Sequence, residues 1–300
     1  MESTGRAKWL AGAFLLCALA AASGVHASEI GDALPGPQGV EEGAWRRQAW
    51  LIPLPGERLL MHATLLRPRG AGPFPLAVIN HGSSQSSLRR AQFEPSDYEH
   101  VSRWFLDRGY AVLLPIRPGH GITAGPYFED QGRCESADYA RAGTAAADSI
   151  QAAVEYFTAQ PYIRKSDAVV VGQSAGGWGA LALASRNPDR VRAVVNFSGG
   201  RGGHANNRPN SNCSPERLVA AAGAFGRMAR IPTLWLYTEN DSYFAPALSQ
   251  SMAQAFRRAG GPADYRLLRP FGADGHVFIE RDDAAPVWGP IVEEFLSEHR

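Results

Sequence analysis

The sequence predicts an α/β protein built on a mostly parallel, doubly wound sheet. From about residue 45 onward, apolar segments of strand length alternate with longer segments of helical period, as in strands joined by crossover helices. Strand candidates such as AVLLP at 111–115 and RAVVNF at 192–197 are apolar without alternation, which is typical of strands covered on both faces. A ligand site is therefore expected at the rim where the parallel strands end.

Eight strands and five helices are expected in chain order. The strands are predicted at 45–53, 59–67, 75–81, 111–115, 168–172, 191–197, 231–238 and 265–268. The helices are predicted at 98–108, 138–158, 175–186, 246–259 and 286–299. The first two strands are more polar and are separated by the turn-like LPGE, which favours an antiparallel hairpin at the edge of the sheet.

The N-terminal segment is predicted to be a cleaved export signal, residues 1–27. Arg6 and Lys8 precede 14 apolar residues at 9–22, and Val-His-Ala at 25–27 supplies small residues for cleavage. Fourteen apolar residues are too few for a membrane span, which needs about 20. We expect an exported protein, periplasmic or secreted, without stable membrane insertion after cleavage. Residues 28–44 are expected to form a loose leader before a single domain at 45–300.

The composition excludes several classes of partner. The chain has 300 residues with 45% hydrophobic and 20% charged content, which is typical of a globular protein. Beyond residue 27 it carries 28 basic and 28 acidic residues, so nothing indicates binding to nucleic acid or to an anionic membrane. The oligomeric state stays open.

Two cysteines remain after the predicted cleavage, Cys134 and Cys213. In an oxidising compartment a disulfide between them is the expected state, with two buried thiols as the alternative. Neither cysteine has a further Cys or His at the spacing of metal ligands, so no metal site is expected.

The segment GQSAG at 172–176 joins an apolar strand to a helix. It matches the G-x-S-x-G nucleophile elbow, in which glycines keep Cβ atoms away from a sharp turn that projects the serine above the sheet. Ser174 is therefore the candidate nucleophile. The alternative is that Ser174 only caps the helix.

A serine nucleophile needs a base and an acid, which follow it in the order acid, then histidine, on this type of fold. His276 lies in a glycine-bearing loop beyond the last predicted strand and is the expected base. Asp241 follows the strand at 231–238 and is the expected acid, with Glu239 and Asp274 as alternatives.

An oxyanion hole requires two backbone N–H groups. Ala175, directly after the nucleophile, and Ser83, in the NHGS turn after the strand at 75–81, are predicted to supply them. The loop at 115–134 leaves a strand on the same rim, so Arg117, His120 and Tyr127 are expected to bind substrate, with Phe128 beside them. The 33 residues from Ser198 to Arg230 leave room for only a loop and one helix near 215–228, hence a minimal cap and an open pocket.

The motifs NHG, GQSAGG, TLWLYTENDSYF and GADGH, in this order, resemble those of the α/β-hydrolase superfamily, and within it the dienelactone hydrolase-like group. The likeness extends from about residue 45 to the C-terminus. It implies the α/β-hydrolase fold and hydrolysis of a small-molecule carboxylic ester through an acyl-enzyme, without a cofactor or metal. One departure is that family members acting on dienelactone itself use a cysteine nucleophile and are typically intracellular.

Three other functions remain open at this point. An acyltransferase, or a peptidase or amidase, would use the same three residues, and a non-catalytic binding protein would use the same scaffold. A broken set of catalytic residues would indicate the binding protein.

Overall fold

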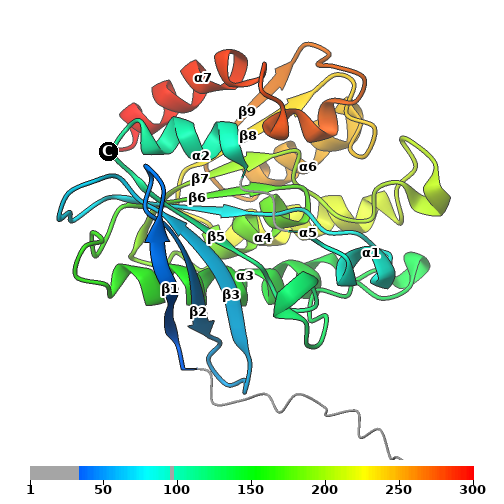
Figure 1. Ribbon diagram of the computed structural model, residues 1–300. Coiled ribbons are helices and arrows are strands. Elements are labelled where there is room, and N and C mark those ends of the chain that lie inside the picture. The colour runs from blue at the N-terminus through cyan, green and yellow to red at the C-terminus, as the bar shows by residue number, and fades with distance from the viewer. Residues whose placement is uncertain (1–33, 95–97) are drawn as a thin grey trace, which may run out of the picture. The chain divides into compact units, whose positions relative to one another are not determined.

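The computed structural model describes residues 34–94 and 98–300, of which residues 35–300 form one compact unit. Its centre is a nine-stranded sheet in the order β1-β2-β3-β5-β4-β6-β7-β8-β9 (Figure 1). The strands are β1 (Gly36–Glu42), β2 (Arg47–Pro53), β3 (Leu60–Leu66), β4 (Leu76–Asn80), β5 (Ala111–Pro115), β6 (Ala168–Gln173), β7 (Val191–Phe197), β8 (Thr233–Thr238) and β9 (Ala263–Leu268). Strands β1, β2, β3 and β5 pair antiparallel in turn, and all other pairs are parallel. The predicted mostly parallel sheet with an N-terminal hairpin is confirmed.

Helices cover both faces of this sheet. The helices of the described residues are α1 (Ser87–Ala91), which has no buried residue, α2 (Glu99–Leu106), α3 (Tyr139–Thr158), α4 (Ala175–Ala184), α5 (Pro215–Met228), α6 (Pro246–Arg258) and α7 (Ala285–Glu298). Helices α2 and α7 lie on one face, and α3, α4 and α5 lie on the other (Figure 1). Within the described ranges, none of these helices is long and apolar enough to cross a membrane.

The two apolar layers follow from the period-2 geometry of the strands. In β4, Leu76 and Val78 pack into the layer with α3 and α4, whereas Ala77 and Ile79 face the layer with α2 and α7. All four side chains are buried. A central strand therefore has no polar face, which explains the absence of alternation in its sequence.

The structure has one strand more than the eight predicted, and the additional strand is β1 (Gly36–Glu42). It lies within residues 28–44, so the prediction that this segment is a loose leader was wrong for residues 36–42. Strand β1 pairs with β2 in the register Gly36↔Leu51 to Glu42↔Arg47. Glu41 also accepts hydrogen bonds from Arg46 Nε and from Arg67 Nε, the latter at 2.9 Å. A Gly- and Pro-rich sequence has weak strand propensity, but an edge strand needs only one partner's backbone. The predicted signal, residues 1–27, lies outside the described residues.

The segment between β7 and β8 contains one substantial helix, α5, at the position expected from the sequence. Its Leu218, Ala222 and Phe225 are buried in the layer that covers the sheet. Helix α5 is therefore a layer helix, and only the irregular segment before it, residues 198–214, is left to lie beside the site.

That segment is tied to the loop before α3 by the expected Cys134–Cys213 disulfide, whose Cα atoms are 4.9 Å apart. Hydrogen bonds cross the same junction. Ser214 Oγ donates to Cys134 O at 2.8 Å, and Tyr139 OH donates to Cys213 O. Two loops that are 79 residues apart in sequence are thus fixed to each other.

Reduction of this disulfide is expected to lower the free energy of unfolding by about 4 kcal/mol, because the bond closes a long loop in the unfolded chain. For a domain of this size the melting temperature should fall by roughly 10 °C. Thermal denaturation with and without reductant measures the change. A Cys134→Ser/Cys213→Ser variant is the control and should not respond to reductant. Two reactive thiols in denatured, unreduced protein would contradict the bond.

Candidate active site

Ser174 lies at a sharp turn between β6 and α4, with φ 54° and ψ −119°. A non-glycine residue rarely adopts a positive φ, and it does so where surrounding packing imposes it. The packing here excludes side chains at two positions. A Cβ on Gly176 would lie 2.2 Å from Asn80 O, and one on Gly172 would lie 2.4 Å from the backbone of Gly176. Both glycines of the G-x-S-x-G segment are thus required by backbone contact.

The side chain of Ser174 makes no capping hydrogen bond to α4, which removes the helix-cap interpretation. Its Oγ instead lies 3.0 Å from His276 Nε2. His276 belongs to a short 3₁₀ helix, Gly275–Glu280, that follows β9. The predicted base is therefore brought to the predicted nucleophile across 102 residues of sequence.

Asp241 completes the series on the far side of the imidazole. Its Oδ1 and Oδ2 lie 3.0 and 3.2 Å from His276 Nδ1. Oδ1 also accepts the backbone N–H groups of Tyr243 and Phe244 at 2.8 and 2.9 Å. An ionised carboxylate can only accept, so Nδ1 carries the imidazole proton and Nε2 is left to accept from Ser174.

The two alternative acids have other positions. Glu239 is exposed at the end of β8. Asp274 caps the 3₁₀ helix by accepting from His276 N at 3.0 Å, and it binds Ser242 N and Oγ. These hydrogen bonds lower the pKa of Asp274 against the opposing effect of burial. Of the three carboxylates, Asp241 is the one that contacts the ring of His276.

A further aromatic contact holds His276, which the sequence did not indicate. The ring of Tyr243 stacks on the imidazole with 4.0 Å between centroids, and His204 stacks on the other face of Tyr243 at 3.6 Å. His204 therefore reaches the site through Tyr243, from the segment at 198–214.

The predicted oxyanion residues lie beside the nucleophile. Ala175 is the first residue of α4, so its N–H has no partner within the helix. Ser83 follows Gly82, where a Cβ would lie 3.3 Å from Ser174 Cβ. His81 is buried in the same turn. It donates from Nδ1 to Gly82 O at 2.6 Å and accepts from Arg117 N at Nε2, which is a structural arrangement.

A cleft of about 970 Å³ opens over these residues, and its wall includes Ser174, His276, Ser83 and Ala175. Of the residues predicted to bind substrate, His120 and Tyr127 line the cleft. Arg117 does not, and that prediction was wrong. Its side chain is 0% exposed, because the guanidinium is directed inward to Glu129. Arg201, which no sequence pattern indicated, lines the cleft instead.

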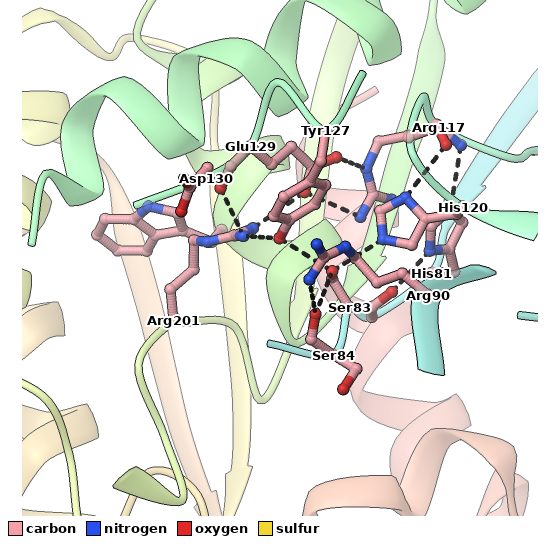
Figure 2. Close-up of polar contacts among 12 residues, drawn as sticks. His81, Ser83, Ser84, Arg90, Arg117, His120, Tyr127, Glu129, Asp130 and Arg201 are labelled. Atoms are coloured by element: carbon pink, nitrogen blue, oxygen red, sulfur yellow. Dashed lines mark hydrogen bonds and ion pairs between the residues drawn. The ribbon is translucent and has the colours of Figure 1, made fainter. Parts of the chain in front are cut away.

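Glu129 is the centre of a buried ion cluster. It accepts from Arg117 Nε at 2.5 Å and from Arg201 Nη1 at 2.9 Å (Figure 2). Burial alone would raise the pKa of this carboxyl, but the two guanidinium groups lower it to about 2. No sequence periodicity marks Glu129 or Arg201, since both lie in irregular loops after strands.

The described residues were also searched for side chains that could bind a metal ion together. Across residues 34–94 and 98–300, no group of three or more His, Cys, Asp or Glu side chains is placed to hold a metal ion.

The fold is that of an α/β-hydrolase. Solved structures with this fold include an acetyl xylan esterase from Paenibacillus sp. R4, with 16% identity, TM-score 0.63 and coverage of 89% of this chain and 88% of that one. They also include an esterase from Pyrococcus furiosus (13%, TM-score 0.61, 89% and 99%). A third is Est1E from Butyrivibrio proteoclasticus with ferulic acid bound (17%, TM-score 0.57, 83% and 98%).

A model of the dienelactone hydrolase family matches residues 91–293, and the chain belongs to that family. A search of curated proteins finds no match. The resemblance seen in the sequence motifs is thereby confirmed, and the protein is a hydrolase by family.

Replacing Glu129 by Gln should destabilise the protein by about 3–5 kcal/mol at pH 7, because two buried guanidinium groups lose their counter-charge. A carboxyl with a lowered pKa stabilises the fold above its unfolded pKa, 4.5, and this contribution is lost as pH falls toward 2. The difference in free energy of unfolding between wild type and Glu129→Gln, measured by urea denaturation, should therefore become smaller below pH 4.5. Glu135→Gln, an exposed carboxyl in the same loop, is the control. A difference in free energy of unfolding that does not depend on pH would contradict the lowered pKa of Glu129.

Proposed function

We propose that this protein is an exported serine hydrolase that cleaves carboxylic esters through an acyl-enzyme on Ser174. The observation that carries the proposal is the unbroken series of hydrogen bonds from Asp241 through His276 to Ser174. A serine hydroxyl needs such a base to act as a nucleophile near neutral pH. The series also argues against a non-catalytic binding protein, for which a broken series would be expected.

The first half of the reaction forms the acyl-enzyme. Ser174 Oγ attacks the ester carbonyl while His276 Nε2 takes its proton, and Asp241 stabilises the imidazolium that results. The backbone N–H groups of Ser83 and Ala175 donate to the oxyanion of the tetrahedral intermediate. His276 then gives its proton to the departing alcohol.

The second half repeats these roles with water. His276 removes a proton from a water molecule that attacks the acyl-enzyme, and it returns that proton to Ser174 Oγ as the bond between Ser174 and the acyl group breaks and the acid is released. The open cleft admits water to this step. A transferase would use an alcohol in its place.

Acetyl esters and esters of aromatic acids are the first substrates to test. One structural neighbour is an acetyl xylan esterase, and another binds ferulic acid. A panel of p-nitrophenyl esters of graded acyl length, with aryl and sugar esters, covers both.

Export is supported by the signal-like residues 1–27 and by the disulfide, which persists in oxidising compartments.

A fluorophosphonate should label the mature protein at Ser174, because its histidine partner, His276, is in turn held by the carboxylate of Asp241. Peptide mass mapping identifies the labelled residue. Ser174→Ala should abolish both labelling and ester hydrolysis. Labelling at Ser83 or Ser198 in the wild type would overturn the choice of nucleophile.

Asp241→Asn should lower kcat by about 10²–10⁴ and leave the fold intact, because an amide at this position favours the wrong imidazole tautomer. Steady-state kinetics and circular dichroism measure the two effects. Glu239→Gln, an exposed neighbour, is the matched control and should change kcat less than twofold. The acid is misassigned if Glu239→Gln or Asp274→Asn lowers kcat more than Asp241→Asn does.

A further inference from the structure

A continuous series of side-chain contacts runs from the buried ion cluster to the predicted oxyanion turn. Arg201, held by Glu129, donates from Nη2 to the hydroxyl of Tyr127. That hydroxyl lies 3.1 Å from Ser83 Oγ, and Ser83 Oγ lies 2.8 Å from His120 Nε2. Figure 2 shows these residues joined end to end.

The direction of each hydrogen bond in this series is determined by its ends. Arg201 can only donate, so the Tyr127 hydroxyl accepts from it and directs its own proton to Ser83. At the other end, His120 Nδ1 lies 3.1 Å from Arg117 O and 3.2 Å from Pro118 O. Carbonyl oxygens only accept, so Nδ1 carries the imidazole proton.

His120 is neutral at neutral pH, because burial lowers its pKa to about 4. With the proton on Nδ1, Nε2 is an acceptor, and the Ser83 hydroxyl donates to it. Ser83 Oγ therefore accepts from Tyr127 and donates to His120, with Ser84 O as a more distant acceptor at 3.4 Å.

The polar atoms of Tyr127 and His120 are thus engaged inside the protein. Both residues line the cleft, but both ring nitrogens of His120 are bonded, and its side chain is 1% exposed. The ring of Tyr127 is covered by the guanidinium of Arg90 at 3.6 Å, and Arg90 also binds Ser84 O at 2.8 Å. These contacts hold the turn that contains Ser83 and do not leave the two side chains free for substrate.

We propose that Tyr127 and His120 are positioning residues that act through Ser83. The directed series Arg201–Tyr127–Ser83–His120 fixes the Ser83 side chain and, with it, the backbone N–H that donates to the oxyanion. The inference rests on the proposed function. It replaces the direct substrate contacts expected from the sequence for these two residues.

A double-mutant cycle tests the proposal. Tyr127→Phe removes one hydrogen bond to Ser83 Oγ, and Ser83→Ala removes that bond together with the one to His120, but both variants keep the Ser83 N–H. Loss of a whole oxyanion donor lowers kcat by 10²–10³, so a displaced donor should lower it by about tenfold, with KM within twofold. The double variant should lose no more than Ser83→Ala alone, because that substitution already removes the contact that Tyr127→Phe breaks.

The matched control is Tyr110→Phe. Tyr110 OH accepts from Arg192 Nη2 at 2.8 Å, the same kind of pair at the opposite end of the strands. The Tyr110→Phe substitution should leave kcat and KM unchanged. A boronate that forms a tetrahedral adduct on Ser174 should bind about tenfold more weakly to Tyr127→Phe and unchanged to Tyr110→Phe.

Three kinetic results would overturn the proposal. These are an unchanged kcat in Tyr127→Phe, multiplied losses in the double variant, and a raised KM at constant kcat, which would indicate direct substrate contact.

Failure of the proposed function itself is separately visible, as absence of hydrolysis and of fluorophosphonate labelling in the wild type. In that event, NMR relaxation of the Ser83 backbone amide tests the positioning role. A lower order parameter in Tyr127→Phe than in wild type and Tyr110→Phe supports positioning, and an equal value overturns it.

Discussion

The close backbone packing around Ser174 is the constraint on which the site depends. Strand β6 and helix α4 meet at an angle that leaves no room for a Cβ at Gly172 or Gly176, and Asn80 O of β4 lies against the same turn. This packing holds Ser174 at a positive φ and directs its hydroxyl to the rim. The turn after β4 and the loops after β8 and β9 reach that rim because parallel strands end on one side of a sheet.

The loops around this turn are held by buried polar interactions. Asp241 accepts two backbone N–H groups besides the imidazole, so its carboxylate is held by the backbone as well as by His276. Glu129 joins the loop after β5 to Arg201 after β7, and the Cys134–Cys213 bond ties the same two loops a few residues further on. Charge-assisted bonds in a dry site are strong, and their loss leaves unpaired charge. The cleft walls are therefore preorganised by ion pairs and a covalent bond where regular structure is lacking.

The fold was largely predictable, and so were the residues of the candidate catalytic series. Buried strands and layer helices leave a strong apolar pattern, and the elbow at Ser174 has a local signature that depends on glycine. The chain order of acid and histidine then leaves few candidates. Strand β1 was missed because its Gly- and Pro-rich sequence has no apolar pattern, and its pairing depends on β2 and on Glu41 meeting Arg46 and Arg67.

The sequence by itself determined the sheet, the elbow, the candidate residues Ser174, Asp241 and His276, and the family resemblance, because each is encoded by local pattern or chain order. The tertiary structure alone decided which loop side chains face the cleft. Arg117, His120 and Tyr127 are equivalent in a sequence, yet Arg117 is directed inward to Glu129 while Arg201, from another loop, takes its place at the wall. The reason is that a buried guanidinium must be paired with a carboxylate. Which carboxylate pairs with it depends on how loops distant in sequence are brought together.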